Sequence, residues 1–169
     1  MPKGLKSTSS LITIGARVEE SAANTFTSLR IDLQLNPLDN EVFVVTAIDL
    51  DARFPEYIAT KQTINTFMLT TTEQASMPTF DNSAVLAEKV QSINDAASVG
   101  GVYMETNSTE SPSSLLEYLG IIATNDFFLN IQGFQNTGVM TGAAKVYGYR
   151  ARADAAVYAA LVQSEVLSS

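Results

Sequence analysis

Residues 26–52, FTSLRIDLQLNPLDNEVFVVTAIDLDA, hold the pattern that decides the fold. From Leu29 to Leu35 apolar residues alternate with polar ones, which is typical of a β-strand with one face in water. Residues 36–40, NPLDN, are turn formers. Residues 41–51 are first apolar on both faces and then alternate. We therefore predict two strands joined by a short turn.

Further strands are predicted on both sides of this segment, because β-branched or alternating residues recur there. The segments with either pattern are residues 11–14, 62–73, 102–106, 116–124, 126–134 and 144–153. With the first two strands this makes about eight. The Ser- and Thr-rich residues 106–114 predict a surface loop, for which partner contact and plain solvation are both possible interpretations.

A short internal helix is predicted within residues 81–101. Leu86, Val90 and Ile93 recur at helical spacing, and the polar residues just before them are suitable caps for the first turn. Two consecutive glycines end the segment. The sequence therefore predicts one helix in the middle of an otherwise β-rich chain.

A second helix is predicted at the C-terminal end. Asp154 stands at a capping position before the alanine-rich segment AAVYAALVQSEVL, residues 155–167. This segment has apolar residues at i, i+4 spacing, namely Val157, Tyr158, Leu161 and Val162. A final buried strand is the alternative.

These elements predict an all-β fold, an antiparallel jelly-roll sandwich of about eight strands with one short internal helix and a C-terminal helix. Strands and helices do not alternate along the chain as a parallel sheet would require. We expect residues 1–169 to form one domain, because no linker or repeat divides them. Residues 1–9 are expected to be a flexible N-terminal arm.

Composition argues against most catalytic chemistry. Cysteine and histidine are absent, which removes thiolate metal sites, the usual base near neutral pH and the commonest metal ligand. No phosphate-binding glycine motif and no serine nucleophile elbow occurs. We therefore expect no enzyme, no catalytic residue, no cofactor and no metal site. Near the N-terminus the apolar patch spans only four residues, 11–14, which is too short for a signal peptide, and no window could span a membrane.

Asp49 and Asp51 are the best candidates for an ion site, since residues i and i+2 of a strand point to the same face. Such a pair suits calcium or magnesium. The alternative is two solvated acids at the polar end of an amphipathic strand, and we favour it. Glu19, Glu20 and Glu41 are also expected to be solvated.

Charge is sparse and unevenly distributed. The chain has 10 basic and 18 acidic residues, a net charge of −8, and a charged fraction of 17%. Residues 62–144 hold one basic and eight acidic side chains, a net −7, so strong direct binding to nucleic acid is not expected. Lys145, Arg150 and Arg152 form the only basic cluster. This cluster is suited either to the acidic region of a neighbouring subunit or to internal pairing with Asp154 or Glu165.

Three stretches resemble the small single jelly-roll capsid proteins of tailless viruses, of the kind found with marine microbial hosts. They are NEVFVVTAIDLD (40–51), EYLGIIATNDFFLNIQG (117–133) and YRARADAAVYAALVQSE (149–165), and the pattern extends over residues 10–167. The resemblance implies a virion coat subunit that binds copies of itself and other capsid proteins. Many such coats have a basic genome-binding arm, but here only Lys3 and Lys6 stand in the first ten residues, so contact with an underlying membrane or inner protein layer takes its place.

The candidate subunit interface therefore combines the basic cluster with the apolar helix. Its residues are Lys145, Arg150, Arg152, Val157, Tyr158, Leu161 and Val162. A carbohydrate-binding or cell-surface β-sandwich module is the alternative function. A carboxylate-based hydrolase ranks third, because sequence spacing in a sheet protein does not reveal whether two acids face each other.

Overall fold

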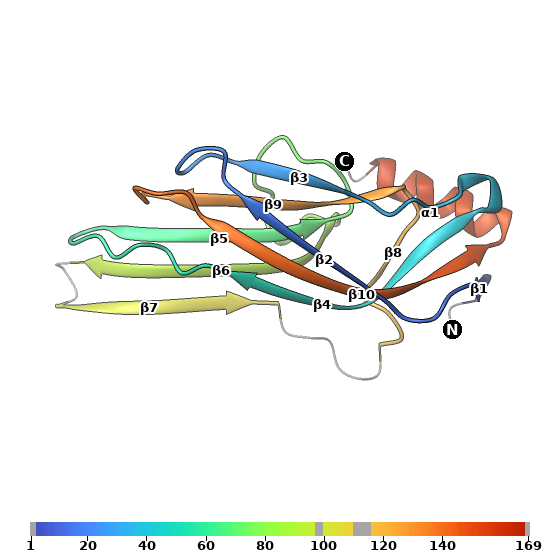
Figure 1. Ribbon diagram of the computed structural model, residues 1–169, viewed down its shortest axis with the longest axis horizontal. Helices are drawn as coiled ribbons and strands as arrows, with labels where there is room; N and C mark the ends of the chain where they lie inside the picture. Colours follow the sequence, from blue (N-terminus) through green and yellow to red (C-terminus); the bar gives the residue numbers. More distant parts are fainter. Residues whose placement is uncertain (1–2, 97–99, 110–115, 168–169) are drawn as a thin grey trace.

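The computed structural model describes residues 3–96, 100–109 and 116–167. They form two antiparallel sheets and a C-terminal helix (Figure 1). Sheet 1 consists of β1 (Leu5–Ser7), β2 (Ile12–Glu19), β4 (Glu41–Ala52), β8 (Gly120–Ile122) and β10 (Thr141–Ala153). Sheet 2 consists of β3 (Thr27–Asp32), β5 (Gln62–Thr70), β6 (Val85–Ala96), β7 (Gly101–Ser108) and β9 (Asp126–Phe134). The helix, α1, spans Ala155–Leu167.

Eight of these strands pair in the nested order of a jelly roll. The first pairs with the last, β2 with β10, and the following pairs are β3 with β9, β4 with β8 and β5 with β6. Pairing of β10 with β4 and of β9 with β5 joins these four pairs into two sheets. The predicted all-β sandwich is therefore confirmed. β1 and β7 are additions, each at an edge of its sheet.

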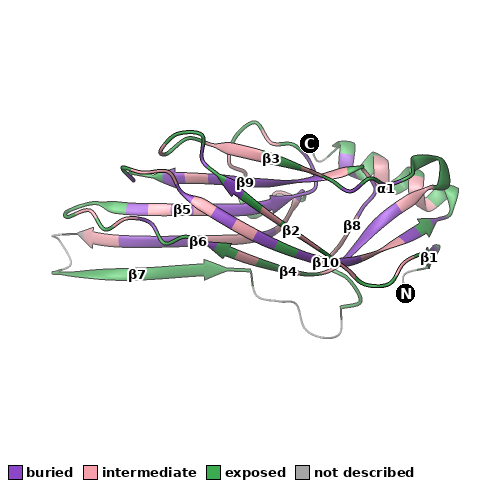
Figure 2. Cartoon of the chain, in the orientation of Figure 1, coloured by how far each residue is buried: buried purple, intermediate pink, exposed green. Residues whose placement is uncertain are grey.

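The main core fills the space between the sheets, as the buried segments in Figure 2 show. Phe43 from sheet 1 and Phe67 and Phe127 from sheet 2 are its largest fully buried side chains. Each contributes about 1.5–3 kcal/mol by leaving water. The register between β10 and β4 shifts between Tyr147 and Gly148, and a Cβ added to Gly148 would lie 2.3 Å from the Val44 carbonyl oxygen. The core thus requires glycine at this position.

The two strands predicted within residues 26–52 are present, but they belong to different sheets. β3 ends at Asp32, and Gln34 has a φ of 53°, so the chain leaves sheet 2 before the alternating pattern stops. Leu33 and Leu35 nevertheless pack into the main core. The alternation extended past the strand because this crossover also has one buried side.

The internal helix is a wrong prediction, because the segment forms strand β6. A spacing of four places Leu86 and Val90 on one side of a strand as well as of a helix, so these positions did not discriminate between the two. β6 pairs with β5 on one edge and with β7 on the other, which satisfies its backbone. Ala87 and Ile93 are buried in the extended conformation. Residues 97–99 of the predicted segment lie outside the described residues.

The C-terminal helix is confirmed, and Asp154 caps it. Its Oδ1 accepts a hydrogen bond of 2.8 Å from the Val157 N–H.

Three other segments differ from the prediction. Part of the predicted arm forms β1, with Leu5 buried, and only three residues of segment 116–124 form a strand. Of the predicted loop 106–114, the first three residues belong to β7, while residues 110–114, like residues 1–2, lie outside the described part of the chain.

Candidate interaction surfaces

Helix α1 covers one end of the outer face of sheet 1 and builds a second, smaller core there. The four apolar helix residues predicted to form a subunit interface, Val157, Tyr158, Leu161 and Val162, are half-buried in this core. They contact a patch from three strands and the segment after β8, namely Leu5, Val42, Val44, Ala123, Ala151 and Ala153. The structure therefore places these candidates against their own sheet.

Glu165 fastens the last turn of α1 to the segment that follows β8. Its Oε1 accepts a hydrogen bond from the Ala123 N–H and its Oε2 accepts one from the Thr124 N–H, each at 2.8 Å. Only 7% of Glu165 is exposed. Burial raises the pKa of this carboxyl above its ordinary value, and the hydrogen bonds from Thr124 and Ala123 oppose the rise only in part.

The outward side of α1 has no charge. Glu165 is the only charged residue of the helix, and it faces inward. The exposed positions are Ala155, Ala156, Ala159, Ala160, Gln163, Ser164, Val166 and Leu167. Val166 and Leu167 are 61% and 78% exposed. A solvated helix normally has its charges on the outside, so this distribution is the reverse of the usual one.

The basic cluster is divided between two environments. Arg150 forms an ion pair of 3.3 Å with Glu41 and donates to the carbonyl oxygens of Leu33, at 2.9 Å, and Gln34, at 3.2 Å. Arg152 pairs with Asp39 at 2.8 Å, and both side chains are more than half exposed.

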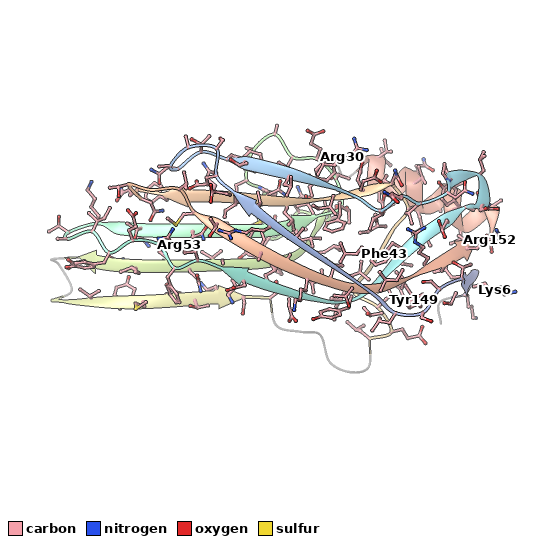
Figure 3. All side chains as sticks on the ribbon, in the orientation of Figure 1. Lys6, Arg30, Phe43, Arg53, Tyr149 and Arg152 are labelled. Atoms are coloured by element: carbon pink, nitrogen blue, oxygen red, sulfur yellow. The ribbon has the colours of Figure 1, made fainter. Side chains whose placement is uncertain are left out.

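Two predictions about these charges need correction. The expected internal pairing occurs, but its partners are Glu41 and Asp39 and not Asp154 or Glu165. Glu41 is half-buried in its ion pair, so it is not the solvated acid that we predicted. Arg152 lies opposite Lys6 of β1, at the same end of the molecule as α1 (Figure 3).

Lys145 lies elsewhere on sheet 1, opposite Asp49 in the pairing of β10 with β4. Together with Asp51 these residues line an open groove of about 560 Å³ on the outer face of the sheet. Asp49 and Asp51 share that face, as predicted, and both are exposed. Within the described residues no three potential metal ligands lie together. Lys145 lies opposite Asp49, so its amine is a charge partner for these carboxylates that requires no bound metal ion.

Two acids at the far end of the sandwich hold the connection between β9 and β10. Glu20 accepts hydrogen bonds from the N–H groups of Gly133, at 2.6 Å, and Met140, at 2.7 Å. Because it is only 3% exposed, the prediction that it is solvated is wrong. Glu56 accepts hydrogen bonds from the N–H and hydroxyl of Thr137, which hold the pKa of Glu56 below its ordinary value.

No protein-family model matches this chain, and no curated protein is recognisably similar to it. The surfaces must therefore be interpreted from their own chemistry. Among the described residues, no helix combines the length and the apolar character that a membrane span requires.

Strand β7 is the surface that the sequence did not reveal. All eight of its residues are exposed, and within the part of the chain that the structure describes it pairs with β6 alone (Figure 2). Val102, Tyr103 and Met104 are 54%, 46% and 60% exposed. The sequence predicted extended structure here, but the exposure of a strand depends on its place in the sheet. The missing signal is therefore tertiary.

Proposed function

We propose that this chain is a structural subunit that assembles with copies of itself, as a coat protein of a viral shell located in the virion. The observation that carries the proposal is the uncharged outward side of α1. Contiguous exposed apolar surface marks interaction sites, whereas single exposed apolar residues are normal. Here eight outward positions of one helix offer small or apolar side chains and only two polar ones, with no charge to keep the surface in water.

Two further observations support the proposal. The jelly-roll topology is common among viral coats, which is an analogy at the level of fold and not a demonstration of function. The net charge of −8 disfavours direct genome binding, so the partners we propose are other copies of this chain and other coat proteins.

The test compares charge at one outward helix position with charge elsewhere. Ala160→Glu and Ala160→Lys each place a charge on the outward side of α1, while Ser83→Glu and Ser83→Lys place the same charges on an exposed turn. Because a buried unpaired charge is costly whatever its sign, we expect both Ala160 variants to remain folded but unassembled. Both Ser83 variants should assemble like the wild type.

Negative-stain microscopy and circular dichroism are the measurements. The proposal predicts particles, sheets or rings for the wild type and for both Ser83 variants, and dispersed molecules with unchanged β-sheet content for both Ala160 variants. A wild type that stays dispersed at every concentration, or an Ala160→Glu protein that still assembles, contradicts it.

The groove on sheet 1 favours a second candidate, a carbohydrate-binding module. Asp49, Asp51 and Lys145 supply acceptors and donors along an open groove, and the Tyr147 hydroxyl lies 3.4 Å from Asp49. Calorimetric titration against a glycan panel tests this function. It predicts binding that Asp49→Asn weakens, in a protein that remains monomeric, whereas no heat with any glycan argues against it.

A further inference from the structure

The strands at the sheet edges differ in how they are protected against pairing with another chain. Native proteins protect such edges with charged residues, especially lysine, with proline, with bulges or by keeping the strand short. β8 is only three residues long, and the edge strands β1, β2 and β3 contain Lys6, Arg17 and Arg30, respectively. β7 is eight residues long and contains no basic residue, no proline and one charge, Glu105. Its pairing with β6 has no bulge.

The free edge of β7 offers a regular row of backbone groups. The Thr109 N–H donates to the Glu88 carbonyl oxygen at 3.0 Å, so Thr109 is oriented toward β6. Orientation alternates along an antiparallel strand. The backbone N–H and C=O groups of four residues therefore point away from β6, namely those of Val102, Met104, Thr106 and Ser108. No described strand lies beside this edge, so these groups can pair with an additional strand.

The side chains at this edge also lack a cover. Met104 lies opposite Ile93 of β6. Ile93 is on the same face of sheet 2 as Phe67, which is in the main core, so Met104 is on the side that faces the sandwich interior. Sheet 1 does not extend over β7, which lies at the lower border of the molecule in Figure 1. As a result Val102 and Met104 are more than half exposed although they are on the core side of the sheet.

We propose that β7 pairs antiparallel with β7 of a second copy of this chain, around a two-fold axis that passes midway between the two copies of Met104. Such an axis stands perpendicular to the sheet, so it joins the two copies of sheet 2 into one continuous sheet. The inference deepens the proposed assembly and rests on it for its biological meaning. The contact itself does not involve α1.

Charge and strand length favour this register over the two neighbouring symmetric ones. An axis between the two copies of Glu105 would place two like charges directly opposite each other, which is destabilising. An axis between the two copies of Tyr103 would pair only residues 101–105. The axis between the two copies of Met104 pairs residues 101–107, sets Tyr103 opposite the second copy's Glu105, and sets Val102 opposite its Thr106. Identical strands thus complement each other, which is why the partner is a second copy.

The strength of this contact follows from the same pairing. Three hydrogen-bonded pairs, centred on Met104, exchange two bonds each, so the edge gains about six backbone hydrogen bonds. A single strand pair buries less accessible surface than the roughly 1,200 Å² of a stable interface, so the dimer is weak. Residues 62–144 have a net charge of −7 in each copy and repel each other. Salt screens this repulsion, so dimerisation should strengthen as ionic strength rises.

Cross-linking through a single introduced cysteine tests the register directly, because the chain has no cysteine of its own. Met104→Cys places two thiols opposite each other, with Cα atoms about 5.5 Å apart. Val102→Cys and Thr106→Cys are the matched controls on the same side of the same strand. Their equivalent residues are offset by four positions, about 13 Å along the strand.

We expect mild oxidation to convert Met104→Cys to a covalent dimer, faster at high salt, while both controls stay monomeric. Equal cross-linking of all three variants, or none for Met104→Cys at high protein concentration and high salt, overturns the proposal. Met104→Lys is a second variant, since it sets two like charges against each other at a position whose N–H points away from β6 and toward the second copy. It should remain folded and lose the dimer in sedimentation equilibrium.

Combining these variants with Ala160→Glu separates the two proposals. The double variant Ala160→Glu, Met104→Cys should still cross-link through the introduced thiol although it forms no particles. Particles from a Met104→Cys protein that does not cross-link would refute the strand pairing and leave the coat function intact. Cross-linking without particles under any condition would do the opposite.

Discussion

Removal of the Glu165 carboxylate should loosen α1 from sheet 1. In Glu165→Ala, the N–H groups of Ala123 and Thr124 lose their acceptors, and Ala123 is only 4% exposed. An unsatisfied buried donor costs about 1–3 kcal/mol. Because Thr124 is only half-buried, we expect the two losses together to destabilise the protein by about 2–4 kcal/mol.

Glu165→Gln should behave differently. An amide of the same shape keeps one acceptor and loses the other, but it also removes a buried charge. Burial raises the pKa of Glu165 by more than the hydrogen bonds lower it, so keeping this carboxyl ionised in the folded protein costs free energy. Glutamine avoids this cost. These terms oppose each other, and we expect a change below about 1 kcal/mol at pH 7.

The raised pKa also fixes the direction of the pH dependence. The folded protein binds the Glu165 proton more tightly than the unfolded chain, so this group loses stabilising effect as pH rises from its ordinary pKa through its raised folded value. Wild type should therefore gain stability relative to Glu165→Gln as pH falls through that window.

Urea denaturation at several pH values and amide hydrogen exchange in α1 are the assays, because a helix at the edge of a fold can open locally. The reasoning is refuted if Glu165→Ala is as stable as wild type and its α1 amides exchange no faster. It is also refuted if the difference between wild type and Glu165→Gln does not change with pH or changes in the opposite direction.

Three further predictions concern the sandwich itself. Gly148→Ala should destabilise the protein strongly, since its Cβ would lie 2.3 Å from a backbone oxygen. Gly15→Ala is the control and should not destabilise it, because its Cβ would meet nothing within 4 Å. Thermal melts compare the two variants. Phe67→Ala should cost about 3–5 kcal/mol in denaturant unfolding, and a loss below about 1 kcal/mol would contradict full burial. Thr137→Val should raise the pKa of Glu56 toward its ordinary value in a carboxyl NMR titration, because a hydroxyl donor is removed. Stability due to Glu56 is present above its ordinary pKa and is lost as pH falls through the lowered value, so this variant should lose less stability in acid than wild type.

Local sequence patterns predicted an element correctly where the periodicity of its apolar residues fits only one type of secondary structure. β9 and β10 formed where apolar runs or alternation indicated strands, and Asp154 marked the start of α1. β6 was missed because Leu86 and Val90 fit either period, and pairing on both edges decided between them. Such pairing joins distant segments, so a local pattern does not contain it.

The candidate surfaces were predictable only in part. An alanine-rich C-terminal segment with few charges indicated a surface completed by packing, but its apolar stripe faces its own sheet. The sequence shows that Glu165 is the only charge in the helix, yet which way it points depends on the N–H groups of the segment after β8. The exposed edge of β7 has no local signature, because it depends on β7 being the last described strand of sheet 2.

Light scattering on the purified protein, over a wide range of concentration at low and high salt, tests the central claim most directly. If neighbouring copies cover the outward side of α1, the measured mass should exceed 18.2 kDa and rise with concentration. A constant mass of 18.2 kDa under every condition would show that water alone covers this surface, and the account would be wrong.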